Sequence, residues 1–115
     1  MSTDLTRALP LACAPEAIPP KDRVTHFAAA RNLLLERAAG RSDLPDGYQF
    51  RFAADAFDDL VRFVGAERQC CPFLAFELIV ASAGGPLILK ITGPEGTRSV
   101  LRADLDLAPG LQDAG

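Results

Sequence analysis

The chain has 115 residues, of which 49% are hydrophobic and 23% are charged, and its formal net charge is −3. This length allows one domain with a single core, and the composition excludes a wholly disordered chain. The small negative charge gives no general attraction to nucleic acid, and no apolar run approaches the roughly 18 residues of a membrane span. We therefore expect one domain over residues 1–115, ordered over about 8–105, with neither nucleic acid nor a membrane as partner.

The cysteine count indicates a cellular compartment. The chain has three cysteines, an odd number, and its first 14 residues lack the pattern of a secretory signal. Such usage is typical of a reducing environment. We expect a cytoplasmic protein whose cysteines are thiols.

The first half of the chain predicts two strands around a helix. Residues 8–13 are short, apolar and bounded by prolines, which is typical of an edge strand. Residues 21–39 carry apolar side chains at spacings of three and four and are followed by Gly40, which predicts a helix. Residues 44–47 read Leu-Pro-Asp-Gly, a turn, and residues 48–52 alternate aromatic with polar side chains, as in a half-buried strand.

The second half predicts a helix, a hairpin and a last helix. Asp55 is the expected N-cap of a helix that continues to the cysteines and buries one apolar stripe, namely Phe57, Leu60, Val61 and Val64. Residues 73–81 and 87–92 are aliphatic and aromatic, and a glycine-rich linker of hairpin length joins them. A final helix is expected from Gly93-Pro94 to about residue 105.

The expected order of elements is therefore β-α-β-α-β-β-α. We interpret this as a small single-domain α+β fold, with an antiparallel or mixed sheet and the helices packed on one of its faces. One sequence does not determine the order of the strands in the sheet.

A pair of adjacent cysteines stands at the end of the second helix, directly before a proline. In a continuous helix Cys70 and Cys71 would point in different directions, but Pro72 disfavours helical dihedrals at Cys71 and can redirect its sulfur. Glu67 precedes the cysteines by three and four residues, the spacing at which helical side chains meet. Thiolates with a nearby oxygen or nitrogen ligand are the donors that soft cations prefer.

Two thiolates supply half of a tetrahedral site, so further ligands are needed. Cys13, beside the first strand, is the expected third sulfur, and His26 is a fourth candidate although the helical projection places it toward the polar side. The partial negative charge of a helix C-terminus disfavours a reactive thiolate, and a bound cation would offset that charge. The pattern therefore favours metal capture over nucleophilic catalysis.

The run Glu67-Arg68-Gln69-Cys70-Cys71-Pro72-Phe73-Leu74-Ala75-Phe76 resembles a group of small uncharacterised bacterial proteins with an E-x-x-C-C-P-F-x-x-F signature. Similar segments occur appended to regulators of the mercury-resistance type, and the resemblance extends over about residues 10–105. It implies an association with soft metals or thiol stress, with Cys13, Cys70 and Cys71 at the motif positions. The chain lacks the DNA-binding half of those regulators, so the resemblance does not imply transcriptional control.

The leading hypothesis is a soft-metal-binding or thiol-stress protein that uses Cys13, Cys70, Cys71, Glu67 and His26 as candidate ligands. The expected ion is Zn(II), Cu(I) or Hg(II), with no organic cofactor, and a homodimer is left open. Two alternatives stand beside it. One is a thiol-dependent enzyme, such as a reductase or a detoxifying lyase, and the other is an interaction module whose cysteines only fill the core.

Overall fold

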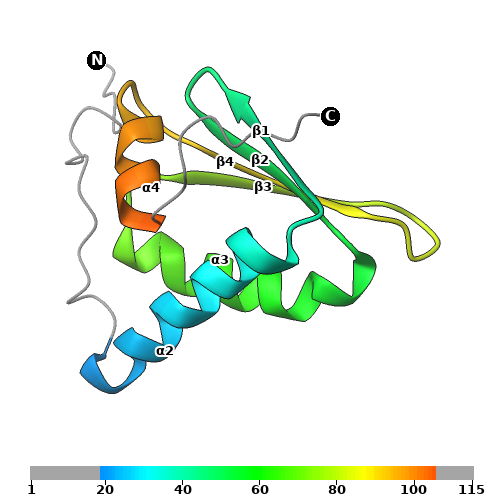
Figure 1. Cartoon of the computed structure of the whole chain (residues 1–115), viewed down its shortest axis with the longest axis horizontal. Coiled ribbons are helices and arrows are strands. Elements are labelled where there is room, and N and C mark those ends of the chain that lie inside the picture. The colour runs from blue at the N-terminus through cyan, green and yellow to red at the C-terminus, as the bar shows by residue number, and fades with distance from the viewer. Residues whose placement is uncertain (1–18, 106–115) are drawn as a thin grey trace, which may run out of the picture.

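The computed structural model describes residues 19–105, so the strand expected over residues 8–13 lies outside the described residues. Within that range the chain forms an α+β fold (Figure 1). Its elements are α2 (Pro20–Arg31) with a π-helical continuation (Asn32–Arg37), β1 (Gly40–Leu44), β2 (Gly47–Phe52), a 3-10 turn (Ala54–Ala56), α3 (Phe57–Cys70), β3 (Ala75–Val80), β4 (Leu87–Thr92) and α4 (Thr97–Leu105).

The four described strands form one antiparallel sheet in the order β1-β2-β4-β3. The helices lie on one face of this sheet, as expected (Figure 1). Buried side chains alternate with more exposed ones along the central strands β2 and β4, and the buried ones point toward the helices. Leu87, Leu89 and Ile91 of β4 are buried, and their register partners on β2 are aromatic. The fold class predicted from the sequence is confirmed, and the sheet is antiparallel throughout its described strands.

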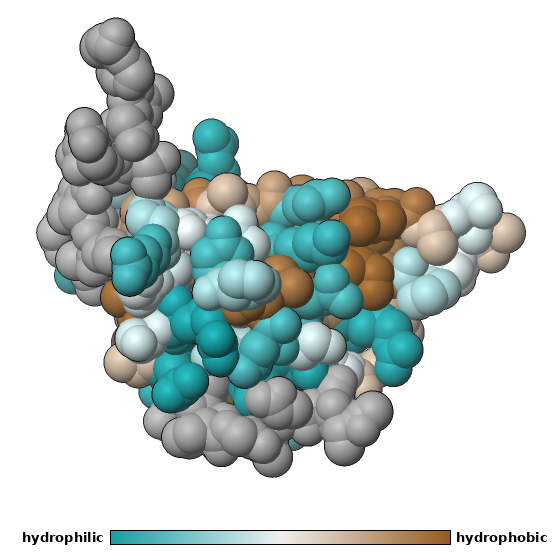
Figure 2. Space-filling view, turned by 90° about the horizontal axis from the view of Figure 1, so that it is seen from above, coloured by the Kyte–Doolittle hydropathy of each residue, from teal (hydrophilic) through white to brown (hydrophobic). Residues whose placement is uncertain are grey.

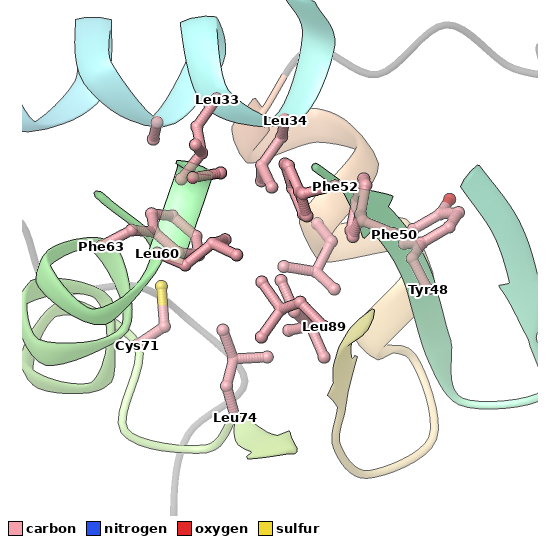
Figure 3. Close-up of a cluster of buried hydrophobic side chains, with 14 of the residues drawn as sticks. Leu33, Leu34, Tyr48, Phe50, Phe52, Leu60, Phe63, Cys71, Leu74 and Leu89 are labelled. Carbon is pink, nitrogen blue, oxygen red and sulfur yellow. The ribbon is translucent and has the colours of Figure 1, made fainter. Parts of the chain in front are cut away.

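The core lies between this sheet face and the helices (Figure 3). Strand β2 contributes Tyr48, Phe50 and Phe52, and the helical layer contributes Leu33, Leu34, Leu60 and Phe63. Cys71 and Leu74 close the same cluster from the segment that follows α3. The C-terminal end of α3 is therefore packed within the core.

The opposite sheet face is covered mostly by polar side chains (Figure 2). Glu77 and Lys90 pair there across β3 and β4. An apolar region lies toward the β3–β4 hairpin, where Ile79 is exposed. This alternation of a buried and a solvated face is typical of antiparallel sheets with helices on one side.

Strand β1 was not predicted from the sequence. The turn over residues 44–47 was predicted correctly, but it joins two strands, and Gly40 begins β1 instead of ending the first helix. Residues 40–44 read Gly-Arg-Ser-Asp-Leu, so this edge strand lacks the apolar alternation that marks half-buried strands. The last helix also begins later than expected, at Thr97 instead of Gly93.

The buried face of α3 differs from the projected one. Phe57 and Val61 are 41% and 48% exposed, whereas Leu60 is buried and Val64 is partly buried. The residues that face the core are Leu60, Phe63, Glu67 and Cys70. The expected stripe of Phe57, Leu60, Val61 and Val64 is therefore wrong in part, because the buried face is rotated toward Phe63 and Glu67. Asp55 is not the N-cap either, since it lies in the 3-10 turn and Ala56 precedes α3 without a side-chain cap.

Candidate metal centre

The end of α3 has the geometry that Pro72 was expected to impose. The helix stops at Cys70, and Cys71 has φ −124° and ψ 78°, outside the helical region. The N–H of Cys71 still donates to the carbonyl of Glu67 at 2.7 Å, so the chain leaves the helix only after its last hydrogen bond. A residue before proline is driven from helical dihedrals because the ring contacts its backbone. The predicted redirection of Cys71 is confirmed.

Three potential ligands converge at this point. Glu67, Cys70 and Cys71 each have a relative exposure of 0%, and one donor atom from each lies within 4.8 Å of the other two. Sulfurs that share one tetrahedral Zn(II) stand about 3.8 Å apart, given Zn–S bonds near 2.3 Å. A side-chain movement of about 1 Å would therefore close these donors around an ion.

Glu67 stands between a nitrogen donor and a sulfur. Its Oε1 accepts a hydrogen bond from Nε2 of His26 at 2.9 Å, and its Oε2 lies 3.4 Å from Sγ of Cys71. The two paired side chains are nearly excluded from solvent, with exposures of 8% for His26 and 1% for Glu67. Because the carboxylate offers only acceptors, the hydrogen bond requires the proton on Nε2 of His26.

His26 is held in place by aromatic rings. Its imidazole stacks on Phe63 at a centroid distance of 6.2 Å and an interplanar angle of 13°, and it meets the edge of Phe27 at 5.1 Å. The projection toward the polar side of the helix was wrong, since the side chain faces α3. His26 is not in the compact group of three donors. It orients the carboxylate of Glu67, as outer partners of metal ligands commonly do.

The two sulfurs differ in oxidation state. Cys71 is disulfide-bonded, whereas Cys70 is a buried thiol. The expectation of thiols throughout is therefore wrong at Cys71. A metal takes the thiolate, so Cys71 must be reduced before it can act as a ligand. Cys13, the third sulfur expected from the sequence, lies outside the described residues.

The buried cluster concentrates negative charge when its groups are ionised. Two thiolates and one carboxylate would share a volume without solvent at a helix C-terminus, which carries its own partial negative charge. Arg68, the cation that follows Glu67, is exposed. Buried charges of one sign are tolerated only when a counter-charge is close. The arrangement suits a bound cation.

Sequence reasoning missed Phe63, which lies on the buried face of α3 together with Leu60, Glu67 and Cys70. Those four positions are separated by three, four and three residues, a helical repeat that is visible in the sequence. The contact between His26 and Glu67 joins residues that are 41 positions apart, and no local pattern encodes it. Only the packing of α2 against α3 brings them together.

No protein-family model, curated protein or solved structure matches this chain. In residues 19–105, no helix combines the length and the apolar character that crossing a membrane requires.

Proposed function

We propose that this protein binds a soft metal ion through Cys70, Cys71 and Glu67, with Cys71 in its reduced form. The observation that carries the proposal is the convergence of two sulfurs and a carboxylate within 4.8 Å at 0% exposure. Thiolate donors favour Zn(II), Cu(I) and other soft ions over Mg(II) or Ca(II). Hg(II) belongs to the same class, and it is the ion to which the resemblance of the Cys-Cys-Pro-Phe run points.

Burial of Glu67 supports a metal role over a purely structural one. A buried ion pair is often matched or exceeded in stability by apolar residues of similar volume. Leu60 and Phe63 show that the same face of α3 packs hydrocarbon well. A carboxylate at position 67 therefore offers no clear gain in stability over an apolar residue there, and metal binding gives a reason for its presence.

The described donors leave a position for a further ligand. Zn(II) in proteins is almost always four-coordinate, and Cys70, Cys71 and Glu67 offer three donors. Cys13 and His26 remain candidates, and so does a donor that arrives with the metal. Since His26 already donates to Glu67, its proposed role is to hold that carboxylate in orientation.

The test is a metal titration of the reduced protein. The chain is reduced with dithiothreitol, desalted without oxygen and titrated separately with Zn(II), Cu(I) and Hg(II) against a competing chelator. We expect one equivalent to bind tightly and thiolate-to-metal charge-transfer absorption to appear with Cu(I) and Hg(II). Glu67→Gln should weaken binding by at least about tenfold. Glu77→Gln, at an exposed position of β3, is the matched control and should have no effect.

Cys70→Ser/Cys71→Ser decides the proposal. If this variant binds all three ions with the affinity of the wild-type chain, the proposed function is wrong. A separate Cys13→Ser variant measures what the third sulfur contributes. Circular dichroism of each variant establishes that a loss of binding is not a loss of fold.

A thiol-dependent enzyme is the second candidate, because His26, Glu67 and Cys71 form a continuous chain of contacts. The order of that chain disfavours it. In an activated thiol the histidine base contacts the sulfur directly, and a third group orients the histidine. Here the carboxylate of Glu67 lies between His26 and the sulfur of Cys71. Rapid alkylation of Cys70 or Cys71 near neutral pH in the metal-free reduced protein would favour the enzyme, and slow alkylation would exclude it.

A further inference from the structure

A cavity of about 500 Å³ opens between α2 and α3, on the side of α3 that adjoins the candidate metal centre. Its volume falls within the roughly 300–1,000 Å³ typical of small-molecule sites. We call it the α2–α3 groove. Its apolar lining comprises Pro19, Ala29, Ala30, Leu33, Phe63 and Ala66, and its polar lining comprises Asp22, Thr25, His26, Asn32, Arg37, Asp59, Arg62 and Gln69.

One end of the groove touches the metal centre through His26. This residue lines the groove and also donates to Glu67 at 2.9 Å. Ala66 and Gln69 line the groove as well, and they precede Glu67 and Cys70 in α3. The fully buried donors therefore lie directly behind the groove wall, and His26 is the side chain shared by the two.

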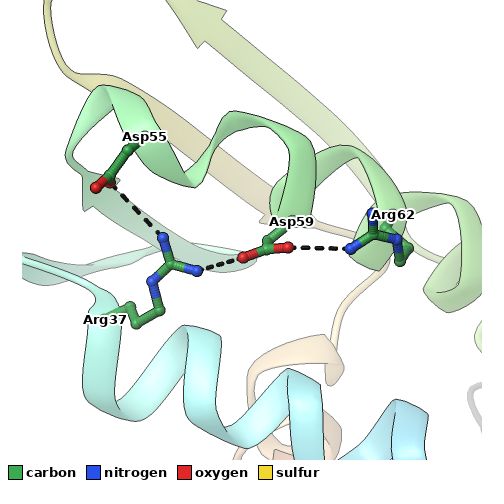
Figure 4. Close-up of polar contacts among 4 residues, drawn as sticks. All are labelled: Arg37, Asp55, Asp59 and Arg62. Atoms are coloured by element: carbon green, nitrogen blue, oxygen red, sulfur yellow. Dashed lines mark hydrogen bonds and ion pairs between the residues drawn. The ribbon is translucent and has the colours of Figure 1, made fainter.

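The other end carries the guanidiniums of Arg37 and Arg62, which both contact Asp59, and Arg37 also pairs with Asp55 at 3.7 Å (Figure 4). Oδ2 of Asp59 accepts from Arg37, and its Oδ1 accepts from Arg62 at 3.0 Å. The two guanidiniums are balanced by the carboxylates of Asp55 and Asp59, so this network of four side chains has no net charge. Arg62 is 76% exposed, and a guanidinium has five N–H donors, so it can also bind an incoming carboxylate.

The distance between the two ends fits an extended small molecule. His26 is opposite Glu67 while Arg37 is opposite Asp59, so α2 and its π-helical continuation run antiparallel to α3. Arg62 and Glu67, the residue that His26 contacts, are five positions apart along α3, which corresponds to about 7.5 Å at 1.5 Å per residue. A ligand in the groove can place an anionic group at Arg62 and a second functional group near His26.

We propose that the α2–α3 groove binds a low-molecular-weight thiol that carries carboxylates, and that this thiol delivers the soft metal to Cys70 and Cys71. The inference rests on the proposed function. The sulfur end of the carrier lies near His26 and its carboxylate lies against Arg62. A soft ion in a cell is held by thiolates, so a carrier of this class matches both the donors behind His26 and the exposed guanidinium of Arg62.

Delivery is an exchange of ligands without oxidation or reduction. Each metal–sulfur bond to the carrier breaks as a metal–sulfur bond to Cys70 or Cys71 forms. The proton of each cysteine thiol passes to the departing carrier thiolate, so two bound carrier molecules leave as two thiols. Glu67 then supplies an oxygen donor to the ion. The step starts from reduced Cys71: two free molecules of the same class of thiol first reduce its disulfide, becoming one disulfide themselves and leaving thiols on Cys71 and its partner.

The test compares a metal with its thiol complex. The reduced full-length protein is mixed with Cd(II) as the aqueous ion, as its glutathione complex and as its cysteamine complex, and the rate of thiolate-to-cadmium absorption is recorded. Glutathione has carboxylates and cysteamine has none. We expect faster transfer from glutathione than from cysteamine, and a loss of about tenfold in that rate for Arg62→Glu. The loss should be absent for the aqueous ion.

Two matched controls separate the groove from general charge and bulk. Arg68→Glu makes the same charge change on the exposed side of α3, outside the groove, and should leave the rate unchanged. Ala29→Phe places a ring in the groove and should slow transfer from the glutathione complex, whereas Ala28→Phe, at the adjacent exposed position that does not line it, should not.

The outcomes distinguish the two proposals. If aqueous Cd(II) binds through Cys70 and Cys71 while transfer from glutathione is indifferent to Arg62→Glu and Ala29→Phe, the groove inference is overturned and the metal function stands. If the reduced wild-type chain binds no Cd(II) in any form, the proposed function fails first. Equal transfer rates from glutathione and cysteamine would also overturn the inference, because recognition of the carboxylate would be absent.

Discussion

Removing the imidazole of His26 should destabilise the metal-free protein by about 3 kcal/mol. The hydrogen bond from Nε2 to the Glu67 carboxylate is 2.9 Å long and joins side chains that are 8% and 1% exposed. A hydrogen bond to a charged group contributes about 1.5–3 kcal/mol, and a stacked ring such as that of Phe63 about 0.5–1.5 kcal/mol. His26→Ala also leaves a carboxylate buried without its donor, a loss measured at about 3–5 kcal/mol in other buried pairs.

A double-mutant cycle separates the pair from ordinary packing. Glu67→Met replaces the carboxylate with an apolar group of similar length, so His26→Ala/Glu67→Met contains no buried carboxylate in need of a donor. We expect this double variant to be more stable than His26→Ala alone, with a coupling energy of about 2 kcal/mol. His26→Gln keeps an N–H donor and should lose only about 1 kcal/mol, chiefly from the ring contact.

The assay is urea unfolding followed by circular dichroism, with a chelator present so that no metal replaces the missing donor. The free energies of the four proteins come from the midpoints, provided the slope with urea is unchanged. If the effects of His26→Ala and Glu67→Met simply add, the two residues are not coupled. The assignment of His26 as the group that holds Glu67 would then be wrong.

Three further predictions test the backbone, the surface ion network and the helix end. Gly47→Ala should lower the free energy of unfolding by more than about 2 kcal/mol, because the added Cβ would lie 1.8 Å from the carbonyl oxygen of Ile91. Gly65→Ala is the control: its Cβ meets open space within α3, and the free energy of unfolding should rise by up to about 1 kcal/mol. Equal effects of the two variants in urea unfolding would refute the close approach of β2 and β4. The hydrogen bond from Arg37 holds the pKa of Asp59 below its ordinary value of 3.8, so the stabilisation by the ionised carboxylate is present above that pH and is lost as pH falls below it. The difference in free energy of unfolding between wild type and Asp59→Asn should therefore shrink in acid, and a difference independent of pH would contradict this. Pro72→Ala permits helical dihedrals at Cys71 and should weaken metal binding by at least about tenfold while the helical content is retained. Chelator competition measures the affinity, and an unaltered affinity would show that the proline does not determine the geometry of the metal centre.

The features that follow from local sequence were predictable. The class of fold, the turn before β2, the β3–β4 hairpin and the departure of Cys71 from the helix all depend on residues close in the chain. Pro72 is the clearest example. Its ring acts on the residue directly before it, so its effect needs no knowledge of tertiary contacts.

The features that were missed depend on contacts between distant segments. Strand β1 is polar, and its pairing with β2 defines it as a strand. The orientation of His26 depends on α3, which packs against α2 only in the folded chain. The disulfide state of Cys71 is likewise invisible in a count of cysteines. In each case a tertiary contact overrides the local pattern, as it commonly does for propensities.

One helical repeat explains why the candidate ligands are both buried and close together. Leu60 and Phe63 occupy the face of α3 that packs on the core, and Glu67 and Cys70 continue that face toward the end of the helix. In a helix that continued beyond Cys70, Cys71 would stay near Leu60 and Glu67 in projection but point about 100° away from Cys70. Pro72 ends the helix at that point, and the non-helical Cys71 has its sulfur within 4.8 Å of the donor atoms of both Glu67 and Cys70. Packing and ligand placement therefore have a common origin, and a change that shifts the register of α3 should affect both together.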